Sequence, residues 1–85
     1  MRIFNYTITD EIGIHARPAG LLVKEAKQYS SKIIIGMNGR SAEATKLMAL
    51  MGLGVKCGNT VEVMVEGDDE DAALEGMKAF FEQNL

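Results

Sequence analysis

The stretch Lys32-Ile33-Ile34-Ile35-Gly36-Met37-Asn38-Gly39-Arg40 carries the pattern of a β-hairpin. Three consecutive isoleucines favour a strand over Lys32–Gly36, because β-branched side chains pack well on a pleated sheet. Asn-Gly is the preferred pair of a two-residue hairpin turn, where both residues need positive φ angles. The chain after this turn should therefore pair back as a short strand over Arg40–Glu43. The hairpin makes a β-sheet the framework of the fold.

Two more strands and three helices are predicted around the hairpin. Residues alternate between apolar and polar over Ile3–Ile8 and Asn59–Glu66, which is the pattern of strands with one buried face. Periodic stretches predict helices from about Ala16 to Gln28, from Thr45 to Leu53, and from Asp68 onward. The resulting order, βαββαβα, predicts an α+β two-layer open-faced sandwich. Its four-stranded, mostly antiparallel sheet would carry the three helices on one face.

The last predicted helix has two notable positions. Asp68 is expected to cap its first turn, where a carboxylate also suits the positive end of the helix dipole. Gly76 lies inside the helix and costs about 1 kcal/mol relative to Ala. Nothing in the sequence explains that glycine.

Length and composition limit the classes of protein to consider. The 85 residues suit a single domain over 1–85, and the net charge of −3 argues against a non-specific nucleic-acid binder. The one cysteine, Cys57, cannot form an intramolecular disulfide, which fits a reducing compartment. No apolar segment has the length of a membrane span or of a signal peptide. We therefore expect a cytoplasmic protein without nucleic-acid partners or membrane insertion.

His15 is the only histidine of the chain. It directly precedes the helix predicted from Ala16, where unpaired backbone N–H groups and the helix dipole attract anions. Arg17 can donate forked hydrogen bonds to phosphate oxygens, and Pro18 preorganises the first turn. A neutral imidazole is a nucleophile near neutral pH. The residues alone leave two interpretations open: a phosphoryl acceptor, or an ordinary surface histidine.

Other chemistries find little support. His15 and Cys57 lie too far apart in the sequence and are too few to predict a metal site. No motif links either residue to hydrolase chemistry, and no phosphate-binding loop follows Asn38-Gly39. We therefore predict neither a metal nor a cofactor.

Two helices are predicted to present side chains to partners. A helical wheel at about 100° per residue places Ala19, Leu22, Val23 and Ala26 on the buried side of the helix after His15. The opposite side carries Arg17, Gly20, Leu21, Lys24 and Lys27. The segment Leu47–Leu53 is too apolar for all its side chains to face inward, and methionine is common on adaptable binding surfaces. An exposed docking site is therefore favoured here over a fully buried helix.

The stretch Gly13-Ile14-His15-Ala16-Arg17-Pro18-Ala19 resembles the active-site signature of the HPr family, the histidine-containing phosphocarriers of the phosphoenolpyruvate-dependent sugar phosphotransferase system. Leu47–Gly54 is similar to the second-helix region of that family, and the resemblance extends from the first strand to the last helix. It implies that Nδ1 of His15 accepts a phosphoryl group from phosphorylated Enzyme I and passes it to the A component of a sugar-specific Enzyme II. Arg17, with Ala16 and Pro18, would form the acceptor site.

The resemblance also implies a surface that meets both partners, which we call the docking surface: Gly20, Leu21, Lys24, Lys27, Leu47, Met48 and Met51. Such a protein is a carrier and not an enzyme in the strict sense. We expect it to act as a monomer, the simplest form for a shuttle.

One position departs from the family pattern. Many members carry a serine just before the second helix, where a regulatory kinase linked to carbon catabolite control acts. In an ungapped match this position is Lys46, which has no hydroxyl, so we predict that this control is lost. Thr45 is expected to cap the helix rather than to replace the serine. The departure leaves room for a paralogue of the nitrogen system or of a branch such as that for dihydroxyacetone, or for a regulatory protein that only binds partners.

Overall fold

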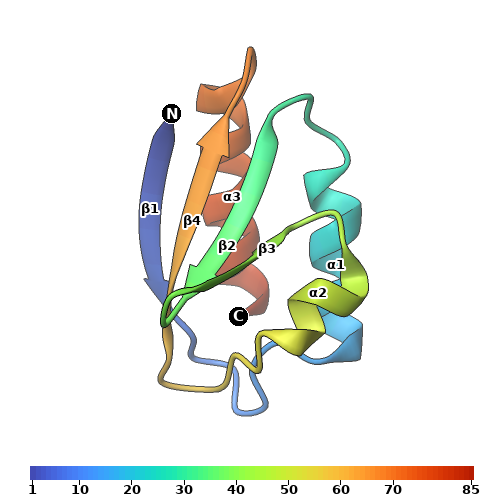
Figure 1. The fold of residues 1–85 in the computed structure, drawn as a ribbon, viewed down its shortest axis with the longest axis vertical. Helices are drawn as coiled ribbons and strands as arrows, with labels where there is room; N and C mark the ends of the chain where they lie inside the picture. Colours follow the sequence, from blue (N-terminus) through green and yellow to red (C-terminus); the bar gives the residue numbers. More distant parts are fainter.

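The computed structural model describes residues 1–85. Its elements, in order, are β1 Arg2–Thr7, α1 Ala16–Ala26, β2 Lys32–Met37, β3 Arg40–Glu43, α2 Leu47–Gly52, β4 Thr60–Glu66 and α3 Glu70–Asn84. The strands form one sheet in the order β1-β4-β2-β3, and every neighbouring pair is antiparallel (Figure 1). The predicted α+β fold, with a four-stranded antiparallel sheet and three helices, is confirmed. None of the helices combines the length and the apolar composition that crossing a bilayer requires.

The hairpin between β2 and β3 forms as predicted. Asn38 and Gly39 both adopt positive φ angles, 53° and 78°, and Met37 pairs with Arg40 across the turn. β2 also pairs with β4 along its other edge, so it lies inside the sheet.

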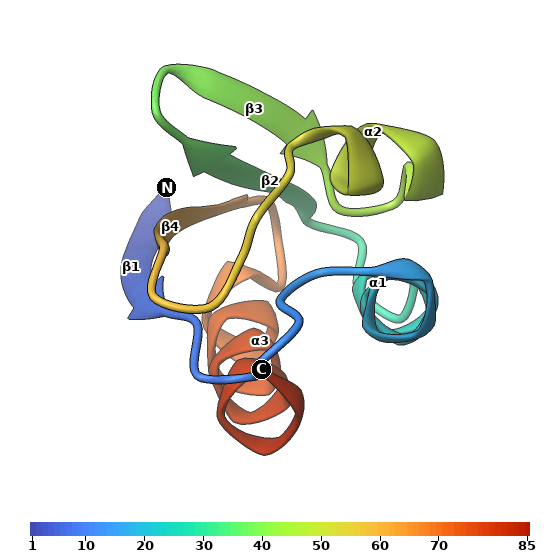
Figure 2. The same ribbon diagram turned by 90° about the horizontal axis from the view of Figure 1, so that it is seen from below.

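The core lies on one face of the sheet. Along β4, Val61, Val63 and Val65 are fully buried, whereas the residues between them face outward. α1 and α3 cover the buried face, and α2 lies beside β3, where it also packs against α1 (Figure 2). Phe81 of α3 makes edge-on contacts with the rings of Phe4 and Tyr6. The other face of the sheet stays open.

The start of α3 corrects one prediction. Asp69, not Asp68, precedes the helix, and its carboxylate does not cap the helix amides. It instead accepts hydrogen bonds from the hydroxyl of Ser31 and from the backbone amides of Ser30 and Ser31. These donors, the Ser31 hydroxyl first, lower the pKa of Asp69 from its ordinary value. The carboxylate therefore ties the start of α3 to the segment between α1 and β2.

The structure gives Gly76 a packing role. A Cβ atom at this position would lie 1.8 Å from Oη and 2.8 Å from Cζ of Tyr29, which crosses α3 at this point. The Tyr29 hydroxyl donates a hydrogen bond of 2.7 Å to Oε2 of Glu25, and this bond, with burial and the nearby carboxylates, raises the pKa of Tyr29 to about 12. A glycine here lets the Tyr29 ring, from the segment that follows α1, lie directly against α3.

We predict opposite effects from two Gly→Ala substitutions in helices. Gly76→Ala should lower the free energy of unfolding by about 1–2 kcal/mol, because displacement of Tyr29 outweighs the better helix propensity of alanine. A Cβ atom at Gly20 in α1 would have no atom within 4 Å, so Gly20→Ala should raise the free energy of unfolding by up to about 1 kcal/mol. Urea unfolding of both variants measures the difference. Equal stabilisation by the two substitutions would contradict the packing role of Gly76.

Candidate functional site

His15 sits at the junction of a loop and α1. Its backbone is extended, with φ −117° and ψ −172°, and the helix begins at the next residue. Its side chain makes no capping hydrogen bond to the helix and is partly exposed to solvent. The imidazole is therefore not engaged in holding the helix end and is accessible for chemistry.

The first turn of α1 offers unpaired donors next to this imidazole. The amides of Ala16 and Arg17 donate to no protein acceptor, and Pro18 has no amide hydrogen. The first intrahelical bond runs from the Ala19 amide to the carbonyl of His15, at 2.9 Å. No acidic side chain lies in this turn. The helix end therefore retains the positive potential that favours an anion.

His15 and Arg17 line the same shallow hollow, which has a volume of ≈ 340 Å³. The other lining residues come from both ends of the chain: Asp10, Pro18, Leu21 and Asn84. Arg17 is exposed and forms no ion pair, because the two ion pairs of the structure join Met1 to Glu70 and Arg2 to Asp71. The guanidinium is therefore free to bind an anion. Nowhere do three or more His, Cys, Asp or Glu side chains gather as a metal site would require.

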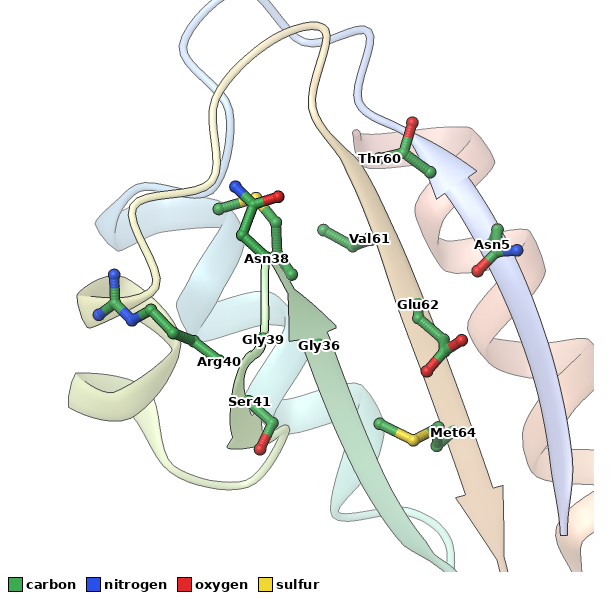
Figure 3. Close-up of a pocket in the computed structure, with 11 residues that line it drawn as sticks. Asn5, Gly36, Asn38, Gly39, Arg40, Ser41, Thr60, Val61, Glu62 and Met64 are labelled. Atoms are coloured by element: carbon green, nitrogen blue, oxygen red, sulfur yellow. The ribbon is translucent and has the colours of Figure 1, made fainter.

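A somewhat larger hollow, of ≈ 390 Å³, lies on the open face of the sheet (Figure 3). Hydroxyl and amide side chains such as Asn5, Asn38 and Thr60 line it, and it contains neither His15 nor Cys57. Arg40 points away from it, toward α2, where its guanidinium donates to the carbonyl of Gly52 at 2.7 Å. This hollow holds neither a histidine nor a cysteine, so the one at His15 is the candidate site.

Known proteins resemble the chain over nearly its whole length. A family model for the PTS HPr component phosphorylation site matches residues 4–83. Phosphocarrier protein HPr of Mycoplasma capricolum is 37% identical over 78 residues, covering 92% of this chain and 88% of that protein. The HPr-like protein Crh of Halalkalibacterium halodurans is 41% identical over 71 residues, covering 84% of each. The chain belongs to the HPr family.

Solved structures agree with this assignment. HPr of Thermoanaerobacter tengcongensis superposes with a TM-score of 0.93 at 36% identity, covering 98% of this chain and 93% of that one. A structure of the HPr dimer from the same organism gives 0.77 at the same identity, covering 98% of this chain and 95% of that one. The function that follows from the family is that of a phosphocarrier in the phosphotransferase system, and not that of an enzyme.

The structure exposes every residue of the docking surface. Gly20, Leu21, Lys24 and Lys27 lie on the outer side of α1, as the helical wheel predicts. In α2, Leu50 is buried, whereas Leu47, Met48 and Met51 are exposed, Met48 by 77%. The prediction that some apolar side chains of this helix face solvent is confirmed. Neither Lys24 nor Lys27 has an acidic partner within 4.0 Å.

Lys46 is the residue that precedes α2, and the helix begins at Leu47. The prediction that Thr45 caps this helix is wrong, because Thr45 lies one residue too early and no side chain caps the helix. Thr45 and Lys46 are both exposed. Lys46 is therefore an accessible lysine at a helix N-terminus.

Three residues near His15 were not predicted. Asp10 and Asn84 line the hollow, and Ile12 exposes 65% of its surface in the loop before His15. Asp10 stands three residues before Gly13, a spacing typical of side-chain-stabilised turns, so a local signal existed. Asn84 reaches the site only because α3 ends there, and its sequence neighbourhood gives no indication of this.

Proposed function

We propose that this chain accepts a phosphoryl group on Nδ1 of His15 and passes it on. The observation that carries the proposal is the free imidazole of His15 in one hollow with an unpaired Arg17, beside two unpaired helix amides. Nδ1 would attack phosphorus as the bond to the donor breaks, and the same exchange runs in reverse toward the acceptor. Arg17 and the amides of Ala16 and Arg17 would stabilise the charge on the transferring oxygens, and Pro18 would hold the turn.

The proposed donor is phosphorylated Enzyme I and the proposed acceptor is the A component of a sugar-specific Enzyme II. The docking surface supports this relay because it combines exposed lysines of the α1 region with exposed apolar side chains of α1 and α2, and these two helices pack against each other. Unpaired lysines increase the rate of encounter with an acidic partner, while a small apolar contact keeps the complex short-lived. A carrier needs both properties.

We propose that the chain acts as a monomer, because one chain supplies His15, Arg17 and the whole docking surface. The dimer of Thermoanaerobacter tengcongensis HPr makes the oligomeric state worth measuring alongside transfer.

A second candidate is a regulatory protein that binds partners without carrying a phosphoryl group. The identity to Crh favours it. The presence of both His15 and Arg17 favours the carrier instead, because partner binding alone requires neither residue in an open hollow.

The first prediction about function tests the carrier itself. Incubation with labelled phosphoenolpyruvate and Enzyme I should label the chain with an acid-labile, alkali-stable phosphoryl group, which a phosphohistidine carries. The label should elute at the monomer mass in size-exclusion chromatography and should move to an Enzyme II A component. His15→Ala should take up none, whereas Cys57→Ser, which removes the other exposed nucleophile, should be labelled normally. Absence of label on the native chain would contradict the proposal.

The second prediction concerns the docking surface. Met48→Ala should raise the KM of Enzyme I for this chain by about 3- to 10-fold with little change in kcat, because it removes apolar contact and leaves His15 intact. Ile3→Ala is the matched control, since Ile3 is also an exposed apolar residue, at 50%, but lies on β1. Steady-state transfer kinetics measure both variants. An equal effect of the two substitutions would contradict the assignment of this surface.

The third prediction concerns regulation. An HPr kinase with ATP should not label the native chain, because Lys46 has no hydroxyl, and Lys46→Ser should become a substrate. Removal of the lysine from the helix N-terminus should also raise the stability of α2 slightly, by about 0.3–1 kcal/mol. Mass spectrometry of the kinase reaction is the measurement. A phosphate on Thr45 or a nearby hydroxyl of the native chain would show that kinase control persists.

A further inference from the structure

The loop between β1 and α1 is held in place by main-chain hydrogen bonds to Leu85, directly after α3, and to the segment that follows α2. The amides of Thr9 and Asp10 donate to the carbonyl oxygen of Leu85, at 2.6 and 2.8 Å. Figure 2 shows this loop passing the end of α3 on its way to α1. Further on, the amide of Ile14 donates to the carbonyl of Val55 at 3.0 Å. These contacts fix the two ends of the segment Thr9–Ile14.

The middle of this segment depends on one side chain. Oδ1 of Asp10 accepts hydrogen bonds from the amides of Ile12 and Gly13, at 2.9 and 3.2 Å. No other protein acceptor serves either amide. Without Asp10, both donors would turn to solvent and the turn would lose its internal support.

Asp10 also belongs to the hollow that contains His15 and Arg17, and it is itself half-buried. The turn that it closes ends two residues before His15. An error of about 1 Å in the position of a reacting group can slow a transfer about a hundredfold. The conformation of the turn therefore affects where the imidazole of His15 lies relative to the free amides of α1.

We propose that Asp10 is a positioning residue for phosphoryl transfer at His15, acting through Oδ1 as the acceptor for the loop amides. This inference rests on the proposed function of His15 and adds a residue to its site. Asp10 does not bond to the phosphoryl group. Its role requires an oxygen acceptor at this place and does not require its negative charge.

The fourth prediction separates these two properties. Asp10→Ala removes the acceptor and should lower the kcat of transfer from Enzyme I about 10-fold, with KM changed less than about 3-fold, because Asp10 lies outside the docking surface. Asp10→Asn keeps an oxygen in the same place without the charge and should transfer at a rate within about 3-fold of the native chain. Glu11→Ala is the matched control, since it removes a neighbouring carboxylate that accepts no hydrogen bond and should act like the native chain.

Amide hydrogen exchange gives a second readout that does not depend on Enzyme I. The amides of Ile12 and Gly13 should exchange at least about 10-fold faster in Asp10→Ala and at nearly the native rate in Asp10→Asn, while the amides of β4 stay protected in both. Should the alanine variant fail to fold, Asp10→Ser, which offers a shorter acceptor, takes its place. The exchange rates of its Ile12 and Gly13 amides should lie between those expected for Asp10→Ala and for Asp10→Asn. Transfer by Asp10→Ala at the native rate, or by Asp10→Asn as slowly as Asp10→Ala, would overturn the proposal.

The two proposals fail in different ways. A native chain that accepts no phosphoryl group would contradict the function assigned to His15. In that event the role of Asp10 in the turn is judged from exchange alone, and native exchange at Ile12 and Gly13 in Asp10→Ala would overturn it.

Discussion

Gly13 packs its backbone directly against the main chain of the segment that follows α2, and the functional site depends on this contact. Its φ angle is +87°, and a Cβ atom there would lie 2.4 Å from the carbonyl oxygen of Val55 and 2.6 Å from Cα of Lys56. No side chain fits at that distance, so only glycine lets the two segments meet. The amide of the next residue, Ile14, then bonds to Val55. His15 therefore directly follows a part of the backbone that this main-chain contact holds in place.

This constraint explains how so small a protein can hold a reactive group on an open surface. A domain of this size buries a thin core and cannot surround a substrate. The core cluster lies between the sheet and the helices, and the hollow of His15 lies outside it, at one end of the molecule. Precision at the site must come from the contacts of the loop. These are its main-chain hydrogen bonds to Leu85 and Val55 and the hydrogen bonds of its amides to Asp10. An open hollow with a rigid rim suits a group that must be received from one protein and given to another.

Local signals in the sequence were sufficient to predict the elements and to select His15 and Arg17 as candidates, which the structure places in one hollow. Asn38-Gly39 specifies its turn through its own φ angles, and the segment from His15 to Pro18 starts its helix without help from distant residues. The Thr45 cap was wrong by one residue in the helix start, whereas other features depended on residues distant in sequence. Asp69 accepts hydrogen bonds from Ser30 and Ser31 instead of capping α3, and the ring of Tyr29, in the same segment between α1 and β2, packs against Gly76. Asn84 joins the site only through the packing of α3, which no local pattern records.

Both helices of the docking surface begin with a positive charge where helices usually prefer a negative one. Arg17 lies in the first turn of α1 and Lys46 precedes α2, and neither first turn holds an acidic residue. Each cation is unfavourable for its helix by about 0.3–1 kcal/mol. With Lys24 and Lys27, these residues form a face that contrasts with the chain's net charge of −3. A phosphoryl dianion on His15 would reverse the sign of the effect at α1. The charge of Arg17, which weakens α1 in the free protein, would then stabilise the loaded form, so the stability given up in α1 becomes affinity for the group that is carried.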